Sequence, residues 1–232
     1  PPRSARTAAV LSSLTLLPIG LMTLLGARHI WRWEAPLREA HAVASAYAEE
    51  AQDSQRRSAD ARAVSALAAA DRLSAATGWF PTTPRVHDLQ ARLYAEAARA
   101  ASGEASVADA RYALAVQAAS DAAADHRQSG AALARLANLE AERAKAAAAP
   151  DEADAGALAP AIEGWRRSLD ANPHFLEVAT RLAVELDLLD DPRAAEVARE
   201  ALAINERMRL DPLRQLPDRT MRRLERIAGP SD

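Results

Sequence analysis

The chain has 232 residues, aromatic residues make up 4% of it, and it contains no cysteine. Without cysteine, the 232 residues contain no disulfide, no thiolate metal ligand and no cysteine nucleophile. The formal net charge of −3 argues against a protein that follows nucleic-acid phosphates, because such a protein needs a strongly basic face. The abundance of alanine favours closely packed helices, since alanine loses almost no side-chain entropy in a helix. We therefore expect an all-α fold and no nucleic-acid partner.

An uncharged stretch of 21 residues runs from Thr7 to Ala27, long enough to cross a hydrocarbon core as a helix. We predict a short N-terminal flank at 1–6 and a transmembrane helix with an interfacial segment at 7–33. Pro18 and Gly20 should kink this helix or let a partner helix pack there. A cleavable signal peptide is the alternative interpretation. The side chains expected at the membrane interface are Arg28, Trp31, Arg32 and Trp33.

The orientation of this span is less clearly encoded, because arginines flank it on both sides. Arg3 and Arg6 precede it, and Arg28, Arg32 and Arg38 follow it. The N-terminal flank contains no acid, whereas Glu34 and Glu39 accompany the arginines on the other side. We therefore expect a single-pass protein of the bacterial inner membrane with a periplasmic soluble domain. A cytoplasmic soluble domain is the alternative.

Beyond the membrane segment, small and apolar residues recur at helical spacing along most of the chain. Within 35–77 we expect two helices. The first is a long helix that ends near Ser58, and the second runs from Ala59 to Thr77. Helices over 85–101 and 106–126 should form an antiparallel pair, because only a short break separates them. Another helix is expected over 131–146.

The stretch from 146 to 160 is longer than a turn between two packed helices requires. Pro150 and Gly156 interrupt a helical pattern here, and the acids favour solvent. We predict an inserted loop at 146–160. It is either a disordered excursion or a loop that contacts a partner.

A repeated pattern dominates the C-terminal half. The segment AIEGWRRSLDANP, Ala161–Pro173, is echoed 33 residues later (194 minus 161) by AAEVAREALAIN, Ala194–Asn205. Helices are expected over 161–171, 175–189 and 193–208. A last amphipathic helix within 211–232 should cap them, because Met221, Leu224 and Ile227 share one face.

This pattern resembles the second helix of the tetratricopeptide repeat (TPR), a family whose stacked helix pairs bind other proteins. The resemblance covers Pro84 to Asn205 and implies an antiparallel helix-pair solenoid, which we expect as a repeat domain at 84–210 that follows the transmembrane helix. Three departures from the family pattern are Ser168 for the usual alanine, Ala198 for an aromatic residue, and Glu206 for proline. The residues expected to pack the repeats together are Ala161, Trp165, Ser168, Leu169, Pro173, Leu182, Leu186, Ala194, Ala198, Ala201 and Leu202.

Two sets of side chains are candidates for partner binding. Some members of the family hold a partner's terminal carboxylate with side chains on inner helices, and Asn138 and Arg181 fall at such places. Ala134, however, occupies an expected lysine position. The second set could meet an acidic subunit or acidic lipid, or simply form a solvated face, and consists of Arg219, Arg222, Arg223 and Arg226.

No constellation for catalysis is visible in the sequence. The five histidines are widely spaced, and none forms a metal-binding pair on one helical face. A glycine-rich phosphate loop and a Gly-x-Ser-x-Gly elbow are both missing from the 232 residues. We therefore expect a protein that is not an enzyme, without catalytic residues, cofactor or metal.

Together these observations predict a non-catalytic, membrane-anchored TPR-like scaffold. Its expected role is that of an accessory or assembly subunit in a larger bacterial membrane complex, with other membrane-embedded subunits and the lipid bilayer as partners. One alternative is a free membrane adaptor that recruits soluble clients. Another is the C-terminal part of an envelope-polymer ligase-type membrane enzyme.

Overall fold

The computed structural model describes residues 38, 42–43, 45–47, 59–77, 84–101, 104–125, 129–148, 155–208 and 215–229. Every regular element in these ranges is an α-helix, so the expected all-α class is confirmed for them. In this part of the chain, no helix is both long and apolar enough to cross a membrane. The span expected at 7–33, with Pro18, Gly20 and the four interfacial residues, lies outside the described residues.

The described helices follow one another through short connections. Most lie within two residues of their expected bounds, because the helical spacing of apolar and small residues defines them locally. They are α2 (Ala59–Thr77), α3 (Pro84–Ala100), α4 (Ala105–Asp125), α5 (Gly130–Ala147), α6 (Ala155–Ala171), α7 (Leu176–Leu188), α8 (Ala194–Arg207) and α9 (Asp218–Ala228).

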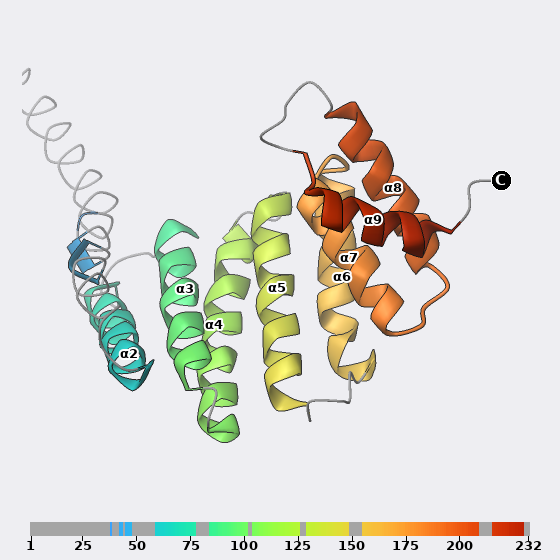
Figure 1. The fold of residues 1–232 in the computed structure, drawn as a ribbon. Helices are drawn as coiled ribbons and strands as arrows, with labels where there is room; N and C mark the ends of the chain where they lie inside the picture. The colour runs from blue at the N-terminus through green and yellow to red at the C-terminus, as the bar shows by residue number, and fades with distance from the viewer. Residues whose placement is uncertain are drawn as a thin grey trace, which may run out of the picture.

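Consecutive helices pack as three antiparallel hairpins, α3–α4, α5–α6 and α7–α8 (Figure 1). The hairpins form a row, with α2 packed on α3 at one end and α9 packed on α8 and α7 at the other. A short antiparallel pair cannot bury enough apolar surface by itself, so each hairpin is stabilised by its neighbours.

The core of this row consists largely of alanine, with a few large side chains in the gaps between helices. Ala137, Ala161 and Ala183 have no exposed surface, and Trp165 is the largest fully buried side chain among the described residues. Alanine allows helix axes to approach closely, and the bulky residues then fill the remaining space at high density. The row is therefore held by many small contacts rather than by one large core.

The structure corrects the expected loop at 146–160. Helix α5 continues to Ala147 and α6 already begins at Ala155, so the second half of the expected loop is helical. Leu158 in this added turn is 2% exposed and belongs to the cluster around Trp165. Burying a leucine side chain contributes about 1.5–3 kcal/mol, which offsets part of the cost of Pro160 inside the helix.

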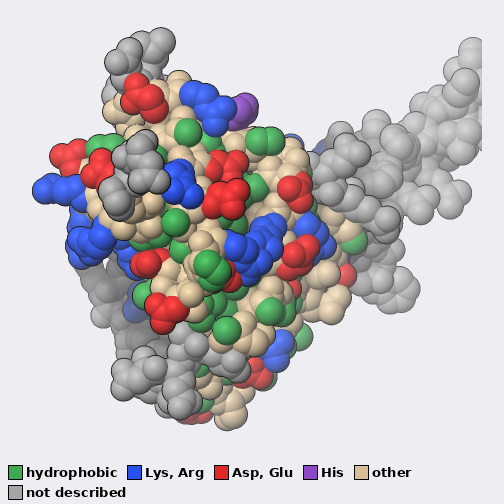
Figure 2. All heavy atoms as spheres, turned by 90° about the vertical axis from the view of Figure 1, so that its right-hand side faces the viewer, with side chains coloured by type: hydrophobic (Ala, Val, Ile, Leu, Met, Phe, Trp, Pro, Cys, Tyr) green, Lys and Arg blue, Asp and Glu red, His purple; other side chains and the backbone are tan. Residues whose placement is uncertain are grey.

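Helix α9 covers the end of the row, which Figure 2 views face on. Leu224 is fully buried against α7 and α8, and Met221 and Ile227 are half-buried on the same side. The chain leading into α9 is held by Asn205, whose Oδ1 accepts a hydrogen bond of 2.8 Å from the backbone N–H of Leu216. The expected amphipathic helix is thus confirmed, with its apolar face turned inward.

Ion pairs connect the first helices of successive hairpins. They are Asp88–Arg135 and Arg99–Glu142 between α3 and α5, and Lys145–Glu185 between α5 and α7. Helices α3, α5 and α7 therefore line one side of the row, with α4, α6 and α8 on the other.

Candidate binding grooves

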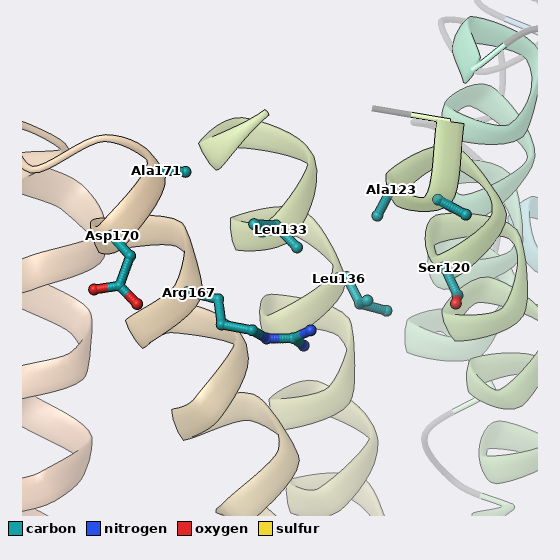
Figure 3. Close-up of a pocket in the computed structure, with 8 residues that line it drawn as sticks. Ser120, Ala123, Leu133, Leu136, Arg167, Asp170 and Ala171 are labelled. Atoms are coloured by element: carbon teal, nitrogen blue, oxygen red, sulfur yellow. The ribbon is translucent and has the colours of Figure 1, made fainter. Parts of the chain in front are cut away.

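An open groove of about 750 Å³ lies between α4 and α6, with α5 as its floor (Figure 3). Its α4 wall is low because it consists of small residues. Its floor is apolar, because Leu133 and Leu136 face it. Figure 3 shows Arg167 extending from α6 toward α5, while Asp170 points to the opposite side of α6. The lining residues are Ser120, Ala123, Ala124, Leu133, Leu136, Arg167, Asp170 and Ala171.

Glu140 follows these leucines on the same face of α5, since Leu133, Leu136 and Glu140 stand at i, i+3 and i+7, which share one side of a helix. Its Oε2 is buried and has no hydrogen-bond partner among the described residues. Burial raises the pKa of this carboxyl group, and the charge of Arg167 partly opposes that shift. Gly164 of α6 lies opposite this carboxyl group: a Cβ built at Gly164 would be in ordinary van der Waals contact with Oε2, at 3.7 Å.

Glu140 was not among the site residues expected from the sequence, although a signal was present. Ala137 on α5 corresponds to Ala183 on α7, 46 residues later in the sequence. The same spacing aligns Glu140 on α5 with Leu186 on α7 (186 minus 140). Leu186 is fully buried in the core around α7. A charged residue thus occupies the position at which the next hairpin has a core leucine. A charge at an apolar repeat position is the clue that could have identified it.

A second groove, of about 670 Å³, lies between α6 and α8 over α7. Its walls are mainly charged, which distinguishes it from the first groove. One of its cations, Arg193, is engaged by Asp191, and these hydrogen bonds lower the pKa of the Asp191 carboxyl to about 2. The lining residues are Glu163, Arg166, Leu169, Asp170, Pro173, Leu182, Arg193, Glu196, Val197 and Glu200.

The structure brings Asn138 and Arg181 together around Trp165. The indole Nε1 of Trp165 donates a hydrogen bond of 2.8 Å to Oδ1 of Asn138. The guanidinium of Arg181 lies 5.4 Å from the centroid of the indole ring, within the range of a cation–π contact. Both side chains therefore have a partner inside the protein. Their role in holding a partner's carboxylate stays a prediction.

The residues expected to pack the repeats occupy three kinds of environment. Leu169 and Leu202 are half-buried and contact the cluster around Leu224, while Pro173 is exposed because it lies in the turn after α6. Ser168 is fully buried and donates a hydrogen bond of 2.8 Å to the backbone oxygen of Gly130. The other buried residues are Ala161, Trp165, Leu182, Leu186, Ala194, Ala198 and Ala201.

The remaining expected site residues lie on α9, where Arg219, Arg222, Arg223 and Arg226 are all exposed. In the described ranges, no three side chains of the metal-ligating types come together as a possible metal site. No protein-family model matches the chain, and no curated protein matches it. Function is therefore inferred from the grooves, the exposed charges and the sequence pattern.

Proposed function

We propose that the chain is a non-catalytic, membrane-anchored TPR-like scaffold that serves as an accessory or assembly subunit of a larger bacterial membrane complex. The repeated pattern at 161–173 and 194–205 supports the assignment to stacked helix pairs. The uncharged stretch at 7–27 supports the membrane anchor, and its acid-free N-terminal flank favours a periplasmic soluble domain.

The observation that carries the proposed protein-binding role is the groove between α4 and α6. Its floor is apolar, with Leu133 half-buried and Leu136 almost fully buried, and Arg167 provides a cation at its side. A groove of this kind suits an amphipathic helix, which places apolar side chains on the floor and polar groups against the charged side.

The groove can be tested by blocking it without disturbing the core. Ala124 lines the groove and is exposed, so Ala124→Arg should fill the space while the hairpin stays folded. Ala110→Arg is the matched control, because Ala110 is exposed on the same helix and outside the groove. Both variants are purified from native membranes in mild detergent and analysed by size exclusion and by crosslinking with mass spectrometry.

We expect the wild-type protein and Ala110→Arg to elute with a stoichiometric partner that crosslinks to α4 or α6. Ala124→Arg should lose this partner, with circular dichroism confirming that its helices are intact. A partner retained by Ala124→Arg would show that binding occurs elsewhere on the molecule. Elution of the wild-type protein as a lone protomer would contradict the subunit role and favour the free-adaptor alternative.

A further inference from the structure

Helix α9 carries a stripe of four arginines, Arg219, Arg222, Arg223 and Arg226, called here the arginine stripe. The positions correspond to i, i+3, i+4 and i+7, so all four side chains emerge from one face of the helix. All four are exposed, and none forms an ion pair within the part of the chain that the structure describes. Figure 2 shows basic side chains gathered at its left edge, the side on which α9 lies.

Exposed arginines elsewhere in the described residues are often held by carboxylates. Arg99 pairs with Glu142 at 2.8 Å, and Arg143 pairs with Asp109 at 2.7 Å. Among the described residues the arginine stripe has no such carboxylate partner, even though Asp218 and Glu225 lie on the same helix. Four adjacent guanidinium groups that are not engaged by these carboxylates form a surface that is electrostatically complementary to an acidic ligand.

The other face of α9 indicates which acidic ligand the surface fits. Leu224 and Ala228 are buried in the protein and Met221 and Ile227 are half-buried, so α9 presents no exposed large apolar side chain to a lipid bilayer. Asp218 and Glu225 reduce the formal charge of the helix to +2 (four arginines and two acids), which is small for adsorption to anionic lipid. Guanidinium groups bind carboxylates through paired hydrogen bonds, and their helical spacing matches acids on a facing helix.

We propose that the arginine stripe docks an acidic segment of a partner protein, one that presents carboxylates at helical spacing. This inference rests on the proposed scaffold function and adds a second contact surface, separate from the groove between α4 and α6. The stripe lies on the helix that closes the end of the row, so a partner bound there extends the assembly beyond α9.

A direct test measures the fluorescence anisotropy of a labelled helical peptide with glutamates at i, i+3, i+4 and i+7. Arg222→Gln/Arg223→Gln weakens the stripe, and Arg62→Gln/Arg72→Gln is the matched control because it removes the same charge from exposed positions on α2. Loss of two charge-assisted contacts should weaken peptide binding by about tenfold or more. The control should bind the peptide as tightly as the wild-type protein does, and added salt should weaken peptide binding by both proteins.

Equal binding by Arg222→Gln/Arg223→Gln and the wild-type protein, or no binding by either, would overturn the inference. Vesicles of phosphatidylglycerol and phosphatidylcholine test the competing ligand. The stripe would be assigned to lipid instead under three results. The wild-type protein would sediment with these vesicles, Arg222→Gln/Arg223→Gln would not, and neither protein would bind the peptide.

Purification of the same variants from native membranes separates the two proposals. If the wild-type protein elutes alone but still binds the peptide through the stripe, the proposed subunit role is wrong and the acid-binding surface stands. If both variants keep a stoichiometric partner and bind the peptide equally, the scaffold function stands and the inference about the stripe is wrong. Loss of partner and peptide only in Arg222→Gln/Arg223→Gln supports both.

Discussion

Glu140 shows how one residue can oppose the packing of an otherwise apolar core. Its carboxyl group lies between α5 and α6 with Oε2 buried and no hydrogen bond from the described residues. Arg167 is near enough to lower the pKa of Glu140, but the effect of burial is larger and the net shift is upward. The ionised form is therefore less favourable in the folded protein than in the unfolded chain. Such a group weakens the fold at neutral pH.

The upward shift of the Glu140 pKa leads to a prediction for Glu140→Leu. At pH 7 the variant should be more stable than the wild-type protein by roughly 1 kcal/mol, because the charge of a partly buried carboxylate is removed. The folded pKa of Glu140 is raised above its usual value of 4.5, so the penalty is present at neutral pH and disappears as the pH falls below that value. The difference in melting temperature should therefore narrow toward pH 4.

Thermal unfolding followed by circular dichroism between pH 4 and pH 8 measures this effect. Glu163→Leu is the control, since Glu163 is exposed on α6 and its removal should change stability little at any pH. A Glu140→Leu variant that is less stable than the wild-type protein at pH 7 would show that the carboxyl group makes a stabilising interaction.

At the scale of the element, the contact between α5 and α6 depends on Gly164. A Cβ built at Gly164 would lie 2.8 Å from Cβ of Ala137, closer than real carbon contacts allow. Glycine inside a helix costs about 1 kcal/mol relative to alanine. The chain therefore accepts a weaker helix at this position because it lets two helix axes approach more closely.

Gly164→Ala should consequently destabilise the protein, although the same change stabilises most exposed helices. The expected loss is about 1–3 kcal/mol, because overpacking at a rigid contact outweighs the gain in helix propensity. Gly156→Ala is the matched control on the same helix, where the position is exposed and the change should be neutral or stabilising. Urea unfolding of the three proteins gives the comparison, and a stabilised Gly164→Ala variant would mean that α5 and α6 can separate without cost.

At the scale of the whole molecule, the single lysine of the chain connects two hairpins. Nζ of Lys145 on α5 lies 2.5 Å from Oε1 of Glu185 on α7. The side chain of Glu185 is only 6% exposed, whereas that of Lys145 is 46% exposed. The lysine therefore reaches in from the surface to neutralise a buried carboxylate where the middle and last hairpins meet.

Lys145→Ala should destabilise the protein by about 2–3 kcal/mol, because it leaves Glu185 buried without a cation. The double variant Lys145→Ala/Glu185→Leu should recover most of this loss, since no buried charge remains. Hydrogen exchange adds a spatial readout, because the loss in Lys145→Ala should appear first in α7–α9. Similar stabilities for the single and double variants would show that the ion pair does not couple the hairpins.

Much of the fold could be predicted from local patterns of apolar and small residues in the sequence. Six of the described helices start and end within two residues of their expected bounds, and the amphipathic cap at α9 was expected from Met221, Leu224 and Ile227. The start of α6 was missed because Pro150 and Gly156 are local helix breakers and the acids between them favour solvent, whereas the burial of Leu158 depends on the distant helix packed against it. The site was less accessible from the sequence: Glu140 and Arg167 were missed, and the contacts of Asn138 and Arg181 with Trp165 were not predicted.

The sequence by itself determined that the described chain is helical, where its helices lie and which face of each is apolar. These properties follow from residues three or four positions apart, which the sequence displays directly. Only the tertiary structure decided which polar groups meet, as in Lys145–Glu185 and Trp165–Asn138. Those partners lie 40 and 27 residues apart in the sequence, and their contact depends on the axial register of whole helices. That register is set by close packing of small residues such as Gly164 and Ala137, which no local pattern specifies.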